Sequence, residues 1–277
     1  MPPATTRQVV TPAQQLTKLA TTQQFYWFLG HVLAVLFFVV TTFTSFFSPR
    51  ASLRYYRFAL LAILITYIIV IKQIYLRKTS TISAVRLIRD ENVQYFVLAL
   101  VFYLSSFKIG VVSGSLYSFI IFAVFHILTY FQNNLLSIVV PNPQTKQHLN
   151  GVINQFTISY NQQALLVAAN AEIMLLVLNV VSLVPSVLIN LLLQRDILYI
   201  VVKAFVAGVT LVFVKFRYDS NQYTKLVIEQ FDLRVVQLLA RFNNPTLTQV
   251  YNGWFKGKVI AKYIAPIQVP KENIKKN

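Results

Sequence analysis

The chain contains no cysteine and few charged side chains. Only 12% of its 277 residues are Asp, Glu, Lys or Arg, against roughly 25% in an ordinary soluble domain. Without cysteine there can be no disulfide, no thiolate nucleophile and no cysteine-ligated metal. The shortage of charge is too large for a water-soluble surface, and 56% of the residues are hydrophobic. We therefore predict a chain that is inserted in a membrane.

Motifs of the common enzyme classes are also missing. There is no glycine-rich phosphate loop, no Gly-x-Ser-x-Gly, no His-Glu-x-x-His and no cluster of carboxylates. The three histidines and eight acidic residues show no metal-ligand spacing. The sequence gives no support for an enzyme, a cofactor or a metal centre.

Long apolar runs indicate several membrane helices, because a helix rises about 1.5 Å per residue and the hydrocarbon core is roughly 30 Å thick. The first run is too long for the core of a cleavable signal and is predicted to be a retained signal anchor. Pro185 predicts a kink in the fifth span. The predicted spans are residues 25–47, 53–76, 93–107, 111–131, 173–193 and 197–214.

Turn-forming residues separate some of these spans. Gly110 and Gly114 predict a tight turn between the third span and the fourth. Residues 132–163 are polar and contain Pro141 and Pro143, so we expect them to form a loop.

The basic residues predict the orientation. The chain carries 25 Lys and Arg and a net charge of +17, and with six spans most of them lie on one side if both termini are cytosolic. Arg50, Arg54 and Arg57 fall on the opposite side, so a shallow hairpin of the first two spans remains an alternative. No contiguous basic surface favours nucleic acid. We predict an all-α polytopic membrane bundle of four to six helices, with amphipathic cytosolic C-terminal helices.

Three regions follow from this pattern: a cytosolic segment (1–24), a helical membrane domain (25–217) and a basic amphipathic cytosolic tail (218–277). Apolar residues recur at helical spacing over 222–242. This helix either packs on the protein's own membrane domain or lies in the headgroup plane of the bilayer.

A second tail stretch, 245–264, mixes aromatic residues with lysines, which suits an anionic cytosolic leaflet. Gly253 and Gly257 weaken the prediction of a helix there, and a solvated tail is the alternative. A lysine-rich end (Lys271, Lys275, Lys276) is a candidate signal for a nuclear transport receptor. The residues predicted to bind membrane are Val227, Phe231, Val235, Leu238, Phe242, Trp254, Phe255, Lys256, Lys258 and Lys262.

Ionisable residues within the spans are costly and need partners. Counted from the turn near Arg195, Glu172 and Arg217 reach the same level on antiparallel helices, whereas Lys203 lies at another depth. We predict that Glu172 pairs with Arg217 or Lys215 and joins the fifth span to the sixth. His126 is expected to hydrogen-bond a neighbouring helix rather than bind a metal.

Several stretches resemble the transmembrane-protein-33 family, also called Krüppel homologue 2, over residues 20–265. Residues 25–31 (Phe-Tyr-Trp-Phe-Leu-Gly-His) and 87–96 are similar to its fungal pore-membrane branch. The other matching stretches are 125–130 (Phe-His-Ile-Leu-Thr-Tyr), 161–163, 170–173 and 216–218 with Ser220.

The resemblance implies residence in the endoplasmic reticulum and nuclear envelope, contact with reticulon-type membrane-bending proteins and, in fungi, a part in assembling or distributing nuclear pore complexes. The resemblance also implies a basic amphipathic C-terminus that binds curved membrane, and residues 222–264 match it. A membrane-shaping scaffold is therefore our first hypothesis. The alternative is a small-solute or ion transporter or channel that uses Glu172, Lys203 and His126, although no inverted repeat supports it.

Overall fold

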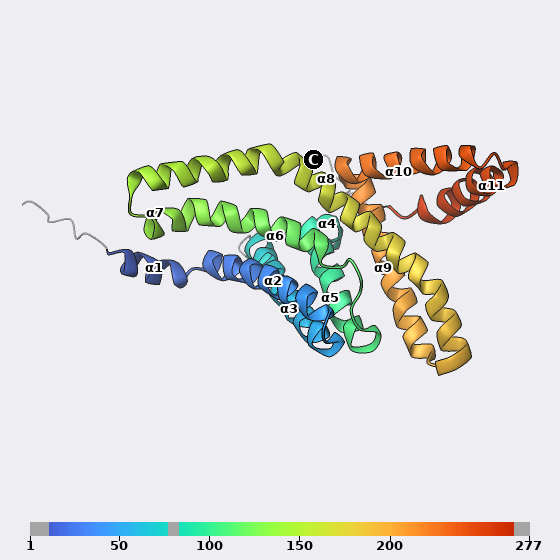
Figure 1. Cartoon of the computed structure of the whole chain (residues 1–277), viewed down its shortest axis with the longest axis horizontal. Coiled ribbons are helices and arrows are strands. Elements are labelled where there is room, and N and C mark those ends of the chain that lie inside the picture. The colour runs from blue at the N-terminus through green and yellow to red at the C-terminus, as the bar shows by residue number, and fades with distance from the viewer. Residues whose placement is uncertain (1–10, 77–82, 269–277) are drawn as a thin grey trace, which may run out of the picture.

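A computed structural model describes residues 11–76 and 83–268, and every regular element in these residues is a helix (Figure 1). The predicted all-α class is confirmed. Elements named η have wider, π-type turns. The elements are α1 (Pro12–Ala20), α2 (Gln23–Ser45), α3 (Pro49–Ile71), η1 (Lys72–Leu76), α4 (Ala84–Arg89), α5 (Glu91–Ile109), α6 (Tyr117–Tyr130), η2 (Phe131–Leu135), α7 (Leu136–Val139), α8 (Pro143–Ile189), η3 (Asn190–Gln194), α9 (Ile197–Ser220), α10 (Gln222–Arg241), α11 (Pro245–Gln249) and η4 (Val250–Ile264).

Six helices of the described residues are long and apolar enough to cross a membrane. They correspond in order to the six predicted spans, so the polytopic bundle is confirmed. Their bounds are Gln23–Ser45, Pro49–Leu76, Glu91–Ile109, Tyr117–Val139, Pro143–Leu193 and Ile197–Ser220.

The first two membrane helices, α2 and α3, form a closely packed antiparallel hairpin. A Cβ atom on Gly30 would lie 2.5 Å from Thr66 Cγ2, so glycine is what lets the two backbones approach. Ser48 caps α3 by accepting a hydrogen bond from the Ala51 N–H at 3.3 Å. The second span measures 28 residues from Pro49 to Leu76, which favours a full crossing over a shallow hairpin.

Arg57, one of the three arginines that opposed the predicted orientation, is not a loop charge. It lies within α3, where its guanidinium donates to Ser106 Oγ at 3.0 Å and to the Ser106 carbonyl at 2.9 Å. The same group lies 4.1 Å from the centre of the Phe107 ring. These contacts join α3 to the end of α5 and satisfy the charge within the protein.

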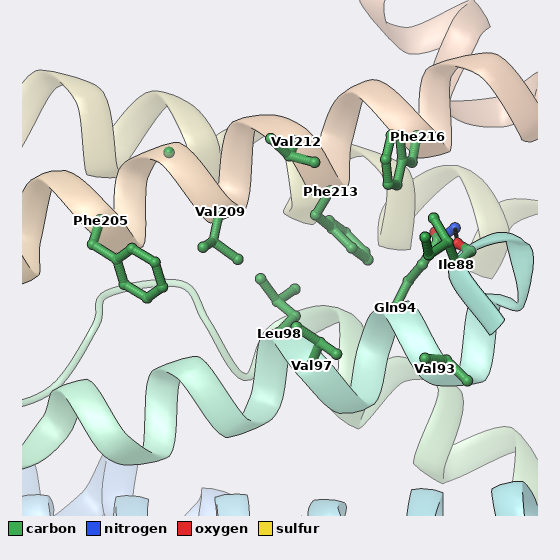
Figure 2. Close-up of a pocket in the computed structure, with 11 residues that line it drawn as sticks. Ile88, Val93, Gln94, Val97, Leu98, Phe205, Val209, Val212, Phe213 and Phe216 are labelled. Atoms are coloured by element: carbon green, nitrogen blue, oxygen red, sulfur yellow. Dashed lines mark hydrogen bonds between the residues drawn. The ribbon is translucent and has the colours of Figure 1, made fainter. Parts of the chain in front are cut away.

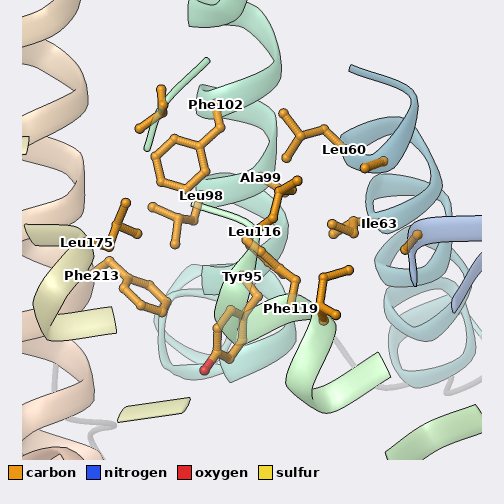
Figure 3. Packing of buried hydrophobic residues seen from close by; sticks show 14 of the residues in the cluster. Leu60, Ile63, Tyr95, Leu98, Ala99, Phe102, Leu116, Phe119, Leu175 and Phe213 are labelled. Carbon is orange, nitrogen blue, oxygen red and sulfur yellow. The ribbon is translucent and has the colours of Figure 1, made fainter. Parts of the chain in front are cut away.

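The buried core lies where α3, α5, α6, α8 and α9 meet (Figure 3). Phe102 and Leu98 of α5 are almost fully buried, and Tyr95 packs edge-on against Phe119 and Phe213. Close packing matters here because lipid is as apolar as these side chains, so contact and shape hold the helices together.

The turn between α5 and α6 is confirmed. Gly110 and Gly114 have φ angles of +77° and +80°, which other residues adopt only at a cost. The fourth membrane helix, α6, begins at Tyr117, six residues after the predicted start of the fourth span at residue 111. The turn occupies the residues in between.

The predicted loop over residues 132–163 is wrong. Helical turns continue to Val139, and α8 then runs unbroken for 47 residues from Pro143. The Asn142 side chain caps α8 by accepting from the Gln144 N–H at 2.9 Å, and Pro143 occupies the first helical position, where its missing N–H costs nothing. Pro143 therefore starts a helix, and Pro141 lies in the short connection before it. Pro185 lies within α8, and the kink there stays a prediction.

Figure 1 shows how these helices place the tail. The apolar half of α8 descends beside α9, away from α2 and α3, while α10 leaves the top of α9 and α11 with η4 folds back below α10. At the other end of α9, Lys108 of α5 pairs with Asp196 at 2.7 Å. The hydrogen bond from Lys108 lowers the pKa of Asp196, which also caps α9.

Candidate functional site: the tail and its anchor

The tail begins without a linker. Asn221 separates α9 from α10, and its side chain accepts hydrogen bonds from the N–H groups of Tyr223 at 2.9 Å and Thr224 at 3.2 Å. The predicted helix over 222–242 is therefore present as α10, and its direction is set by a capped turn at the end of a membrane helix.

The first half of α10 is docked on the membrane domain. Thr224 and Val227 are only 0% and 1% exposed, and Phe231 packs against the same core. Val227 and Phe231 were predicted to bind membrane, but the Val227 side chain is covered by the protein, whereas Phe231 is half-buried and its membrane contact stays a prediction. Their helical spacing was detected correctly, but an apolar stripe does not reveal whether protein or lipid covers it.

A buried polar cluster, which we call the anchor, lies where α5, α8 and α9 meet. Glu172 is 1% exposed, its Oε2 lies 3.5 Å from Arg217 Nε, and its Oε1 accepts a hydrogen bond from the Tyr95 hydroxyl. Arg217 Nη1 lies 2.7 Å from Glu91 Oε1. The guanidinium thus faces two carboxylates, and the cluster ties the start of α5 and the middle of α8 to the end of α9.

The anchor agrees with one of the two predicted pairings. Glu172 lies beside Arg217, whereas Lys215 pairs with Asp219 at 2.5 Å within α9. Lys203 lies elsewhere, as its predicted depth required, and donates to Ser186 Oγ at 2.5 Å. The role of these residues as purely structural intramembrane groups stays a prediction.

His126 has a different environment from the one expected. Its ring packs 4.9 Å from both Trp27 and His31 of α2, and among the described residues no hydrogen bond from it to a neighbouring helix is found. Glu172, Lys203 and His126 therefore contact three separate sets of neighbours. The structure does not bring them together along one polar path.

The second half of α10 and the segment after it expose their apolar residues. Leu238 and Phe242 are 53% and 65% exposed, and Trp254 and Tyr263 are 58% and 65% exposed. Phe255, Lys258 and Lys262 are exposed too, and Val235 is half-buried. Residues 245–264 are helical despite Gly253 and Gly257, as α11 followed by the wide-turned η4. Lys271, Lys275 and Lys276 lie outside the described residues.

One acidic residue fastens η4 to α10. Asp232 Oδ2 accepts from Lys256 Nζ at 2.6 Å, and its Oδ1 accepts from the Tyr251 hydroxyl at 2.6 Å. The hydrogen bond from Lys256, followed by the one from Tyr251, holds the pKa of Asp232 below its usual value. Partial burial and then the hydrogen bond to Asp232 raise the pKa of Tyr251. We call this contact the clasp. It engages Lys256, so Lys258 and Lys262 are the predicted tail lysines left for another partner.

Sequence reasoning missed Tyr95 and Glu91 in the anchor and Asp232 in the clasp. Glu91 and Asp232 are two of only eight acidic residues in a chain with 25 basic ones. That scarcity was a usable signal, because each acid in such a chain has several cations competing to pair with it.

Comparisons with known proteins give a consistent result. The family model described as Transmembrane protein 33/Nucleoporin POM33 matches residues 6–253. The Pore and endoplasmic reticulum protein of 33 kDa of Saccharomyces cerevisiae is 35% identical over 239 residues, which cover 83% of this chain and 87% of that protein.

Two further relatives agree. Nucleoporin POM33 of Chaetomium thermophilum is 33% identical over 187 residues, which cover 59% of this chain and 63% of that protein. Tetra-spanning protein 1 of Schizosaccharomyces pombe is 26% identical over 261 residues, which cover 90% of this chain and 86% of that protein. No solved structure matches the chain.

Proposed function

The chain belongs to the transmembrane protein 33/nucleoporin POM33 family, and on that premise we propose that it is a non-enzymatic membrane protein of the endoplasmic reticulum and nuclear envelope that shapes or scaffolds membrane at nuclear pores. Its six helices hold it in the bilayer. Its tail binds the cytosolic leaflet beside them. The names of the yeast and Chaetomium relatives support the location and the link to pores.

The observation that carries the proposal is the uncovered surface formed by the second half of α10 together with η4. We call it the free tail surface. Large apolar side chains such as Phe242 and Trp254 are more than half exposed there, next to Lys258 and Lys262. Each basic residue near an anionic leaflet contributes about 1 kcal/mol, and the aromatic rings favour the headgroup depth.

The anchor and docked half of α10 give this surface a fixed starting point. Because α10 starts directly from α9, the free tail surface lies next to the membrane that α9 crosses, and both termini are placed in the cytosol by the positive-inside rule. A helix inserted in one leaflet widens that leaflet and favours curvature. Reticulon-type proteins, pore components and a nuclear transport receptor are the partners that this role would use.

The transporter alternative lacks a supporting observation. Lys203 contacts Ser186, and Glu172 contacts Tyr95 and Arg217, so these charged groups have their partners in separate places. We therefore prefer the scaffold.

The membrane-binding test uses the two tryptophans of the chain, Trp27 and Trp254. Replacing Trp27 by Phe leaves Trp254 as the sole reporter in the full-length protein. In small anionic proteoliposomes, lipids brominated near the headgroup should quench Trp254, and quenching should weaken in large neutral ones. Equal and negligible quenching in both would contradict the proposal.

The pore assignment has a separate test. A fluorescent tag at native expression should give a punctate nuclear rim, and the variant Leu238→Asp/Phe242→Asp should shift the signal toward the general reticulum. The matched control Ile158→Asp changes an exposed apolar residue in the polar half of α8, outside the tail, and should leave the pattern unchanged. A uniform reticular signal from the natural chain would contradict a role at pores.

A further inference from the structure

An apolar groove of about 540 Å³ separates α5 from α9 (Figure 2). Val97 of α5 and Val209 of α9 form its walls, and Figure 2 shows Phe205 at one end and Ile88 with Phe216 at the other. Both helices are long and apolar enough to span the membrane. The groove is therefore a gap between two transmembrane segments, bordered by α4 at one end.

An unfilled groove of this size would be costly. Its lining is almost entirely apolar, so water would find few partners there, and an empty gap forfeits the dispersion contacts of every side chain that borders it. In a bilayer the available apolar filler is an acyl chain. The groove also contains Gln94, whose Nε2 donates to the Ile88 carbonyl at 2.8 Å while its Oε1 is buried without a hydrogen-bond partner. A glycerol or headgroup donor would satisfy that oxygen.

One end of the groove is bordered by Ile88 of α4, and this short helix also carries two arginines. Arg86 and Arg89 of α4 are exposed, lie one turn apart and so share a face, and form no ion pair among the described residues. The neighbouring acids are already engaged: Asp90 accepts from Tyr75 at 2.8 Å, and Glu91 faces Arg217 at 2.7 Å. Paired arginines at the end of a cleft between membrane helices suit a phosphate group.

We propose that this groove binds one anionic glycerophospholipid, with an acyl chain between α5 and α9 and its phosphate against Arg86 and Arg89. The site lies in the membrane domain and does not depend on the free tail surface. A bound lipid of this kind would fill the space between α5 and α9 and act as part of the bundle.

Glycine substitutions provide a matched test. A Cβ at Gly208, which lines the groove, meets no atom within 4 Å, and neither does one at Gly151, which lies on α8 away from the groove. Gly208→Leu should fill the groove without a backbone clash, while Gly151→Leu makes the same chemical change elsewhere. Because each variant replaces a helical glycine by leucine, the two substitutions raise helix propensity by the same amount.

The measurement is photolabelling of the full-length protein in nanodiscs of neutral phosphatidylcholine. A trace of phosphatidylserine with a diazirine in its acyl chain is the probe, and labelled peptides are mapped by mass spectrometry. The natural chain and Gly151→Leu should be labelled within residues 93–98 and 205–216. Labelling of Gly208→Leu at these residues should be at least about 5-fold weaker, and a 5-fold change corresponds to about 1 kcal/mol of binding free energy. Equal labelling of the two variants would overturn the site.

Two comparisons test the headgroup. Arg86→Gln/Arg89→Gln should abolish the preference for phosphatidylserine over a phosphatidylcholine probe, whereas Lys258→Gln/Lys262→Gln, with the same loss of charge in the tail, should keep it. Equal labelling of the natural chain by both probes would overturn the anionic ligand. If Gly208→Leu does not fold, a competition experiment on the natural chain replaces it. Adding unlabelled phosphatidylserine should lower the labelling until it reaches a plateau, because one site is being filled. A decrease without a plateau would mean contact with bulk lipid and would also overturn the proposal.

Discussion

The two halves of α10 contrast in what covers their apolar residues. In the first half, Val227 is 1% exposed and Phe231 packs on the core; in the second half Leu238 is 53% exposed, and Phe242, which follows the last helical residue, is 65% exposed. The apolar spacing is the same throughout. The difference teaches that one amphipathic helix can serve as a structural dock at its start and as a binding surface at its end, so substitutions in the two halves should affect different measurements.

The largest effect should come from the anchor, which joins α5 and α8 to the end of α9. Glu172→Lys would place a second cation beside Arg217 in a buried site, and breaking a buried pair typically costs about 3–5 kcal/mol. We expect a large drop in the melting temperature of the detergent-solubilised protein.

The reversed pair is the control for that prediction. Glu172→Lys/Arg217→Glu should recover part of the stability, though not all, because the carboxylate introduced at position 217 would then face Glu91. Adding Lys215→Glu instead should recover nothing, since Lys215 pairs with Asp219. If neither double variant recovers any stability, the ion pair is not what matters at this position.

The docked half itself should be the next most sensitive. Val227→Asp buries a carboxylate without a partner and should lower the free energy of unfolding by about 3 kcal/mol. The control Leu238→Asp, on the same helix but exposed, should change it by less than about 0.5 kcal/mol. Similar melting temperatures for the two variants would remove the contrast between the halves.

The free half should respond in binding rather than in stability. Phe242→Asp removes an exposed ring and adds a negative charge, so we expect several-fold weaker quenching of Trp254 by brominated lipids in anionic proteoliposomes, with an unchanged melting temperature. The matched substitution Phe47→Asp also alters an exposed ring, 75% exposed, but outside the tail. It should leave Trp254 quenching as it was.

The smallest effect should come from the clasp. Asp232→Asn weakens its contacts with Lys256 and Tyr251, and a partly exposed pair is worth under about 1 kcal/mol. Spin labels on cysteines introduced at Gln237 and Asn252 would report the opening as a broader distance distribution. The absence of natural cysteines makes this labelling specific.

The clasp also predicts a pH dependence. The pKa of Asp232 is lowered in the folded tail, so the clasp contributes stability above the ordinary value of 3.8 and loses it as the pH falls through the lower folded pKa. The distance distribution should therefore be constant from pH 5 to pH 8 and broaden only in stronger acid. In Asp232→Asn the clasp is already weakened, and this acid-dependent change should be absent.

Much of the fold followed from sequence because a membrane allows few solutions. Uncharged runs must form helices there, so the six spans and the glycine turn at Gly110 were predictable. The polar segment 132–163 was not, because outside the lipid the composition no longer limits the fold: Pro143 and Asn142 suit a helix start as well as a turn.

The candidate site was predictable to a lesser degree. Counting residues from a hairpin turn put Glu172 level with Arg217, since antiparallel helices share a rise per residue. The same counting could not find Tyr95 or Glu91, which come from a third helix whose rotation depends on packing. It also could not tell which apolar residues of α10 are docked on the protein and which are exposed, because that depends on the surface that packs against the helix and not on the spacing of its apolar residues.

The length of α8 has a mechanical consequence. At about 1.5 Å per residue, its 47 residues extend about 70 Å along the helix axis, more than twice the thickness of the hydrocarbon core. Its polar first half therefore works as a lever arm on its apolar second half. Because the helix is continuous between them, a force applied near His148 would be transmitted to Glu172 and the end of α9.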